Sequence, residues 1–138
     1  MNRLYTLLNF PEKNVTWLLR YWLGIMMMYH SHWVFFEPDG LSGFADYLSK
    51  HGFPIPYVMA IISKSIEFFG GILLILGIGT RVVAFLMASV LGVAVFYMHK
   101  GLFWSEGELA FNYFLMAIVL FLMPSIPFHI LKNKCLGK

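Results

Sequence analysis

The sequence has a single cysteine, Cys135, so no disulfide and no dithiol relay can form within the chain. It also lacks a Cys-x-x-Cys pair or any other set of cysteines spaced for a metal site, and we expect no bound metal. Charged residues are scarce, at 12%, which is about half the share of a typical soluble domain. The net charge is only +3, and no Lys/Arg run interleaved with aromatics indicates a nucleic-acid partner.

Apolar residues are abundant instead. They make up 59% of the 138 residues, and the mean hydropathy is +0.73. A single domain of this size cannot bury so much apolar surface inside itself, so a lipid bilayer is the expected surrounding. Aromatic residues contribute 18% and recur where helices would meet the headgroup layer.

Four apolar segments are long enough, at about 20 residues, to cross a membrane. They span about 15–36, 56–78, 80–98 and 107–123. Lipid admits only helices or closed barrels, and the segments do not alternate as strands do. The sequence therefore predicts one all-α domain over residues 1–138, an integral membrane four-helix bundle.

Local signals mark the ends of these helices. Thr80 is the predicted N-cap of the third segment, and Ser105 with Glu108 fits a capping box for the fourth. The long connection at 37–53 carries apolar residues at helical spacing, opposite polar ones. It predicts a short amphipathic helix lying at the membrane interface. Its apolar positions are Leu41, Phe44, Ala45 and Leu48.

The distribution of basic residues predicts the orientation in a cytoplasmic membrane. With both termini in the cytoplasm, the inner side carries Arg3, Lys13, Arg81, Lys132, Lys134 and Lys138. The outer loops then carry only Lys50 and Lys100. This orientation places the Cys135 tail in a reducing compartment.

Ionisable residues inside the predicted helices are the main candidates for function, because an unpaired charge in hydrocarbon costs several kcal/mol. They are Arg20, His30, Lys64, Glu67, His99 and Glu108. Glu67 lies about 16 Å from the outer end of its helix, and Lys64 is one turn away on the same face. A contact between Arg20 and Glu67 would neutralise both buried charges.

These residues have a functional and a structural interpretation. In the functional one, all except Arg20 line an outward-facing polar cavity that relays protons or anchors a polar head group such as a quinone carbonyl. In the structural one, Glu67 only pairs with a basic neighbour and Glu108 only caps its helix. His99 is then an interfacial residue, and His30 bonds to a backbone carbonyl.

Small residues offer a second pattern, typical of close helix contacts in membranes. They are Gly70, Gly71, Ala84, Ala88 and Gly92. We expect them to serve helix packing, either within this chain or against a partner membrane protein or a second copy.

Several motifs together resemble the DoxX family. They are Leu18-Leu19-Arg20, Tyr29-His30, the loop from Gly43 to Leu48, Gly52-Phe53-Pro54, Glu67-Phe68-Phe69-Gly70-Gly71, Thr80-Arg81 and Gly107-Glu108. The resemblance covers about residues 15–124. The loop with His99 and Lys100 departs from many members, which have a longer polar stretch there.

The resemblance implies a four-helix protein of the bacterial inner membrane, but no fixed reaction. Some relatives resemble subunits of quinone-linked oxidoreductases, and distant ones act as assembly factors. Two hypotheses follow: a subunit of a quinone-linked membrane oxidoreductase, or a non-catalytic assembly factor or scaffold. No metal, haem or flavin motif is present, so any redox cofactor is expected to be quinone or to belong to a partner.

Overall fold

The computed structural model of the protein describes residues 12–100, 104 and 107–123, and this part of the chain is helical without strands. The helices are α2 (Glu12–Phe36), α3 (Gly40–Lys50), α4 (Pro56–Leu76), α5 (Thr80–Val93) and α6 (Glu108–Leu122). A π-helical turn, η1 (Ala94–Met98), continues α5. The predicted all-α class is therefore confirmed for the described residues.

The predicted helix ends are close to the observed ones, with two exceptions. Gly79, not Thr80, is the N-cap of α5, and Thr80 is a buried first helical residue. Gly107 precedes α6 without a side-chain cap, so Glu108 is the first residue of that helix. Ser105, the other half of the predicted capping box, lies outside the described residues.

Two helical segments are long and apolar enough to cross a membrane, Pro56–Leu76 and Thr80–Met98. Only 33% and 28% of their apolar windows are buried inside the protein. A core helix of a soluble protein would be mostly buried, so this exposure favours lipid as the surrounding. α6 is equally apolar in character but shorter, at 15 residues.

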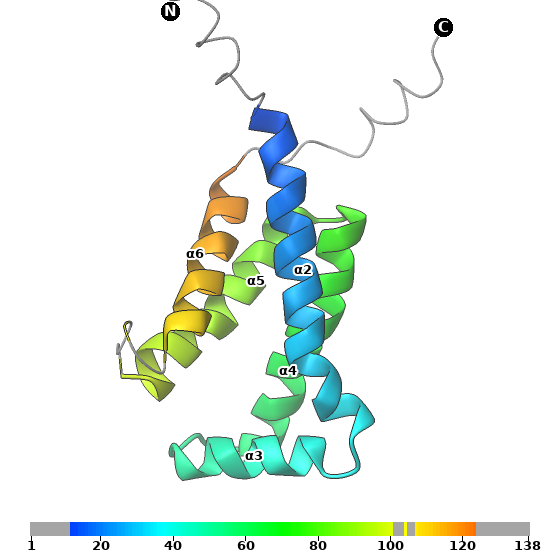
Figure 1. Ribbon diagram of the computed structural model, residues 1–138. Helices are drawn as coiled ribbons and strands as arrows, with labels where there is room; N and C mark the ends of the chain where they lie inside the picture. Colours follow the sequence, from blue (N-terminus) through cyan, green and yellow to red (C-terminus); the bar gives the residue numbers. More distant parts are fainter. Residues whose placement is uncertain (1–11, 101–103, 105–106, 124–138) are drawn as a thin grey trace, which may run out of the picture.

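The long helices form a ring of neighbours. α2 packs on α4, α4 on α5, α5 on α6, and α6 returns to α2, whereas among the described residues the backbones of α2 and α5, and those of α4 and α6, do not come close. α3 lies across one end of the ring, where it packs on α2 and α4 (Figure 1). The opposite end carries the first turns of α2 and the last turns of α6 (Figure 1).

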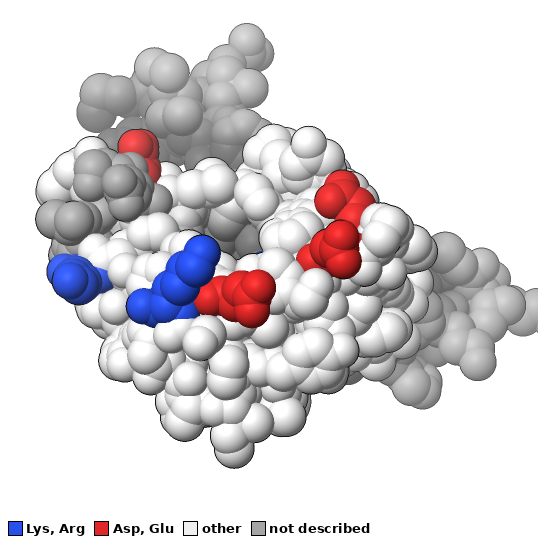
Figure 2. All heavy atoms as spheres, turned by 90° about the horizontal axis from the view of Figure 1, so that it is seen from below, with Lys and Arg blue, Asp and Glu red and all other residues white. Residues whose placement is uncertain are grey.

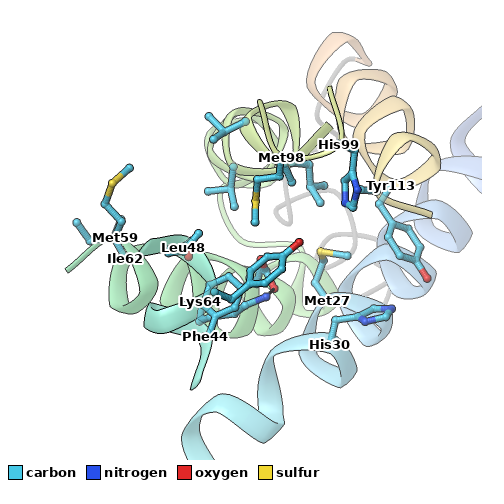
Figure 3. A pocket seen from close by; sticks show the side chains of 18 of the residues that line it. Met27, His30, Phe44, Leu48, Met59, Ile62, Lys64, Met98, His99 and Tyr113 are labelled. Carbon is cyan, nitrogen blue, oxygen red and sulfur yellow. Dashed lines mark hydrogen bonds and ion pairs between the residues drawn. The ribbon is translucent and has the colours of Figure 1, made fainter. Parts of the chain in front are cut away.

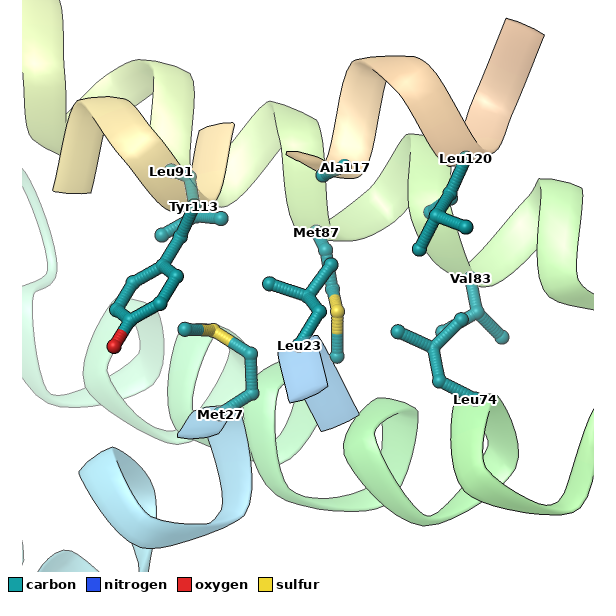
Figure 4. Packing of buried hydrophobic residues seen from close by; sticks show 10 residues of the cluster. Leu23, Met27, Leu74, Val83, Met87, Leu91, Tyr113, Ala117 and Leu120 are labelled. Atoms are coloured by element: carbon teal, nitrogen blue, oxygen red, sulfur yellow. The ribbon is translucent and has the colours of Figure 1, made fainter. Parts of the chain in front are cut away.

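The main hydrophobic core lies inside the ring, between α2, α4, α5 and α6 (Figure 4), and extends away from α3. Its buried residues are Leu23, Met27, Leu74, Val83, Ala84, Met87, Leu91, Tyr113, Ala117 and Leu120. A smaller core lies beneath α3, where Ala45 and Leu48 pack against Ala60 of α4. The amphipathic helix predicted at 37–53 thus exists, with its apolar face on α4.

Glycines set the spacing between α2 and α4. A Cβ on Gly71 would lie 2.7 Å from the carbonyl oxygen of Gly24, and a Cβ on Gly24 would lie 2.7 Å from that of Gly71. Real Cβ atoms essentially never approach an atom so closely, so only glycine fits at either position. The two backbones therefore touch at this level.

The other predicted packing residues also lie at contacts within the chain. Gly70 faces the side chains of Val83 and Met87 on α5. Gly92 faces the ring of Phe114 on α6. Ala84 belongs to the main core, and Ala88 packs against it. The small residues are used in contacts between this chain's own helices.

Candidate functional site

A cavity of about 470 Å³ opens between the helices in the half near α3 (Figure 3). The helices contribute apolar side chains to its walls, among them Met27, Trp33, Leu48, Phe53, Met59, Ile62, Leu91, Met98 and Leu109. The volume falls within the range of about 300–1,000 Å³ that is usual for small-molecule sites. Figure 2 looks onto this end of the molecule and shows a hollow bordered by a few charged side chains.

The strongest polar feature of the cavity is an ion pair on α4. The Lys64 ammonium donates to Glu67 Oε2 at 2.7 Å, across one helical turn. The two side chains are only 10% and 9% exposed. The ammonium also lies 4.5 Å from the ring centre of Phe44 on α3, a cation–π distance. The pair is thus nearly dehydrated and fixed against α3.

His30 of α2 and Tyr113 of α6 meet on another side of the cavity. Their rings are 5.7 Å apart in an edge-to-face arrangement (Figure 3). Within the described residues, His30 makes ring contacts but no hydrogen bond, whereas His32 and His51 each bond to a backbone carbonyl one turn back. The ring nitrogens of His30 are therefore free of protein partners in the described part of the chain.

The π-helical turn at the end of α5 supplies a further part of the wall. His99 N–H donates to the Ala94 carbonyl oxygen at 3.0 Å, which is the i to i+5 bond of a π-helix. This wider turn presents Ala94, Met98 and His99 to the same cavity. Single π-helical turns inside α-helices are frequent at functional sites.

Four of the six ionisable residues singled out from the sequence line this cavity, namely His30, Lys64, Glu67 and His99. Glu108 does not line it and is exposed at the start of α6. Arg20 is elsewhere too. Its guanidinium lies against Gly77 at the end of α4, and its Nε is buried without a hydrogen-bond partner among the described residues.

The predicted contact between Arg20 and Glu67 is wrong, and the register of α2 and α4 explains why. These antiparallel helices touch at Gly24 and Gly71. Arg20 lies four residues from Gly24 toward one end, and Glu67 lies four residues from Gly71 toward the other. The two residues are therefore about 12 Å apart along the helices. At its own level, Arg20 faces the C-terminal end of α4, where helix carbonyls favour a cation.

Tyr113 is a lining residue that the sequence analysis missed. A tyrosine in an apolar helix is usually read as core or as part of an aromatic belt. Tyr113 lies near the middle of α6, away from both ends. At that depth its hydroxyl needs a polar partner or a ligand, and this is the signal in the sequence that could have identified it. In the structure, Tyr113 belongs to the main core and also lines the cavity.

These groups suit a mostly apolar ligand with a neutral polar head. Lys64 and Glu67 neutralise each other, so the cavity offers no strong net charge for an ion. His30, His99 and Tyr113 can donate or accept hydrogen bonds at the head group. Among the described residues, no cluster of three or more His, Cys, Asp or Glu side chains could hold a metal ion.

Comparison with known proteins agrees with the motifs noted above that lie within residues 15–100. The model of the DoxX family matches residues 15–100, which is more than half of the chain and includes α3, α4, α5 and η1. Neither a curated protein nor a solved structure matches the chain. On the strength of the family match, this chain belongs to the DoxX family of membrane proteins.

Proposed function

We propose that this protein is a multi-pass subunit of a bacterial cytoplasmic membrane that binds a lipid-soluble quinone for a quinone-linked oxidoreductase. The observation that carries the proposal is the cavity, with its apolar walls and its ionisable groups His30, Lys64, Glu67 and His99. α2, α4, α5 with η1, and α6 would be the four membrane-spanning helices. Both ends of the chain would lie in the cytoplasm, with α3 at the outer surface.

The residues of the cavity fit a quinone. A quinone has two carbonyl oxygens, which accept hydrogen bonds, on a flat apolar ring. His30 and Tyr113 present donors from two helices at one side of the cavity, and the aromatic side chains of Trp33 and Phe53 provide flat apolar surfaces. Such a set of few polar groups within apolar walls is the usual composition of a small-molecule site.

Each residue has a distinct part in this proposal. His30 and Tyr113 hold the quinone carbonyl, and the Lys64–Glu67 pair supplies or accepts protons near it. A bound quinone contributes the capacity to take up two electrons and two protons. The electrons come from the substrate of a partner subunit.

The scaffold alternative has less support from the geometry. The scaffold hypothesis requires helix faces of small residues that are exposed to a partner protein. Gly70, Gly71 and Gly92 instead lie against side chains or backbone of this chain. A partner would have to use another surface.

Binding of a short-tailed ubiquinone analogue to the protein in lipid nanodiscs tests the proposal. Glu67→Gln and His30→Ala should each weaken binding by about three- to tenfold, the value of one hydrogen bond. The matched controls are Glu108→Gln and His32→Ala, since neither residue lines the cavity. Both controls should bind like the unmodified protein. Absence of quinone binding by the folded protein, or equal losses in the controls, would refute the proposed site.

A further inference from the structure

We infer that the ligand reaches the cavity sideways from the bilayer, through a window between α4 and the α5–η1 segment, and that it carries a long apolar tail which occupies this window. The inference rests on the proposed function and specifies its ligand as an amphiphile with a neutral head. The window is defined by Ile62 and Ser63 on α4 and by Val90, Val93 and Ala94 on α5 and η1.

The window is closed at both of its ends. Toward the main core, Gly70 of α4 packs against Val83 and Met87 of α5. Toward α3, the ring of Phe53 lies 4.7 Å from the ring of Tyr97 on η1. Between these two closures, the backbones of α4 and η1 do not come into contact. Residues on both sides of this gap line the cavity, and we place the opening there.

The rim of this opening is apolar and reaches the outer surface. Ile62 and Val93 both line the cavity, yet they are 54% and 46% exposed. Ile62 and Val93 therefore lie where the cavity meets the outer surface on this side. Ser63, the polar residue among those that define the window, donates its hydroxyl to the Ala60 carbonyl oxygen at 3.2 Å, so its hydrogen bond is made within α4.

The depth of the window identifies what lies outside it. Ile62 is six residues past the start of α4 at Pro56, which places it about 9 Å inside the helix. α4 has 21 residues and spans about 32 Å, close to the thickness of a hydrocarbon core of about 30 Å. Ile62 would then face acyl chains. An apolar rim at this depth admits a hydrocarbon or isoprenoid chain and excludes a hydrated group.

The polar groups lie just inside the window. Lys64 and Glu67 follow Ile62 on α4 by two and five residues, so the pair is within about 8 Å of the rim along the helix. A ligand whose head lies at this pair therefore extends a tail through the window after a short distance. A head group without a tail would leave the rim residues Ile62 and Val93 uncovered.

Cysteine labelling in nanodiscs tests the window without any quinone. Cys135 is first replaced by serine, and Ala110→Cys then places a thiol on the cavity wall formed by α6. A long-chain alkyl maleimide reaches this thiol from the lipid, and a small sulfonated maleimide reaches it from water. Either Ile62→Trp or Val93→Trp should slow the alkyl reagent about tenfold, equal to about 1.4 kcal/mol of added barrier. Neither change should alter the rate of the sulfonated reagent.

Ile61→Trp is the matched control, because Ile61 is also exposed on α4 but does not line the cavity. It should leave both rates unchanged. The inference is overturned if neither rim variant slows the alkyl reagent, if Ile61→Trp slows it equally, or if the alkyl reagent never reacts. Failure of quinone binding, with labelling that still depends on the rim, would instead reject the quinone and keep the window.

Discussion

The two halves of the helix ring differ in how their helices meet. In the half remote from α3, Gly24 and Gly71 bring two backbones into contact, and Leu74 and Leu120 are fully buried within the core. In the half near α3, the helices enclose a cavity of about 470 Å³. The same four helices are therefore close-packed at one end and separated at the other.

Side-chain size and polarity account for this difference. Small residues stand where the helices touch, since membranes give no hydrophobic drive for association and close packing must replace it. Near α3, the larger side chains of Lys64, Phe44 and Tyr113 occupy the space between the helices. The Lys64–Glu67 ion pair also requires polar neighbours. The packed half thus provides the rigidity that positions groups in the open half.

The largest effect should come from removing one charge of the pair in the open half. Lys64→Met leaves Glu67 buried without its partner and removes the cation from the Phe44 ring. The expected loss of stability is about 3–5 kcal/mol, measured by denaturant titration of the protein in detergent. The double variant Lys64→Met with Glu67→Leu should recover most of that loss, because no unpaired charge remains. A single variant as stable as the unmodified protein would mean that water entering the cavity solvates Glu67.

A smaller loss is expected from a single methyl group in the packed half. In Gly71→Ala the new Cβ meets the Gly24 carbonyl oxygen at 2.7 Å, so α2 and α4 must separate. Overpacking of this kind costs about 1–3 kcal/mol, and thermal unfolding in detergent measures it. Gly43→Ala on α3 is the control, since a Cβ there meets nothing within 4 Å. Equal unfolding temperatures for both variants would contradict the backbone contact.

The helices could largely be predicted from sequence because hydrophobic length in a membrane leaves few alternatives. The amphipathic segment was predictable for a different reason: its apolar residues recur at helical spacing, and the structure has α3 there. The starts of α5 and α6 were less predictable. Thr80 and Ser105 suggested side-chain caps, but Gly79 and Gly107 precede these helices without them. The π-helical turn had no signal in the sequence.

The candidate site was predictable in composition but not in geometry. Ionisable residues in apolar helices are recognisable because they are costly, and this identified His30, Lys64, Glu67 and His99. Which of them meet depends on helix register, and the backbone contact at Gly71 sets that register. Arg20 is consequently displaced from Glu67 by about two helical turns. The sequence showed that Gly71 was small, but not which residue of α2 it would touch.

The smallest effect, and the most direct comparison of the two halves, comes from two alanines on α6. Ala117 is fully buried in the main core, and Ala110 lies two turns away on the same face but lines the cavity. Ala117→Leu should cost about 1–3 kcal/mol because no space is available for the larger side chain. Ala110→Leu should change stability by less than about 0.5 kcal/mol, since the added atoms enter open volume. The same variant should weaken quinone binding, because it occupies the volume of the ligand. Equal destabilisation by the two changes would mean that the half near α3 is as closely packed as the other, and the cavity could then not receive a ligand.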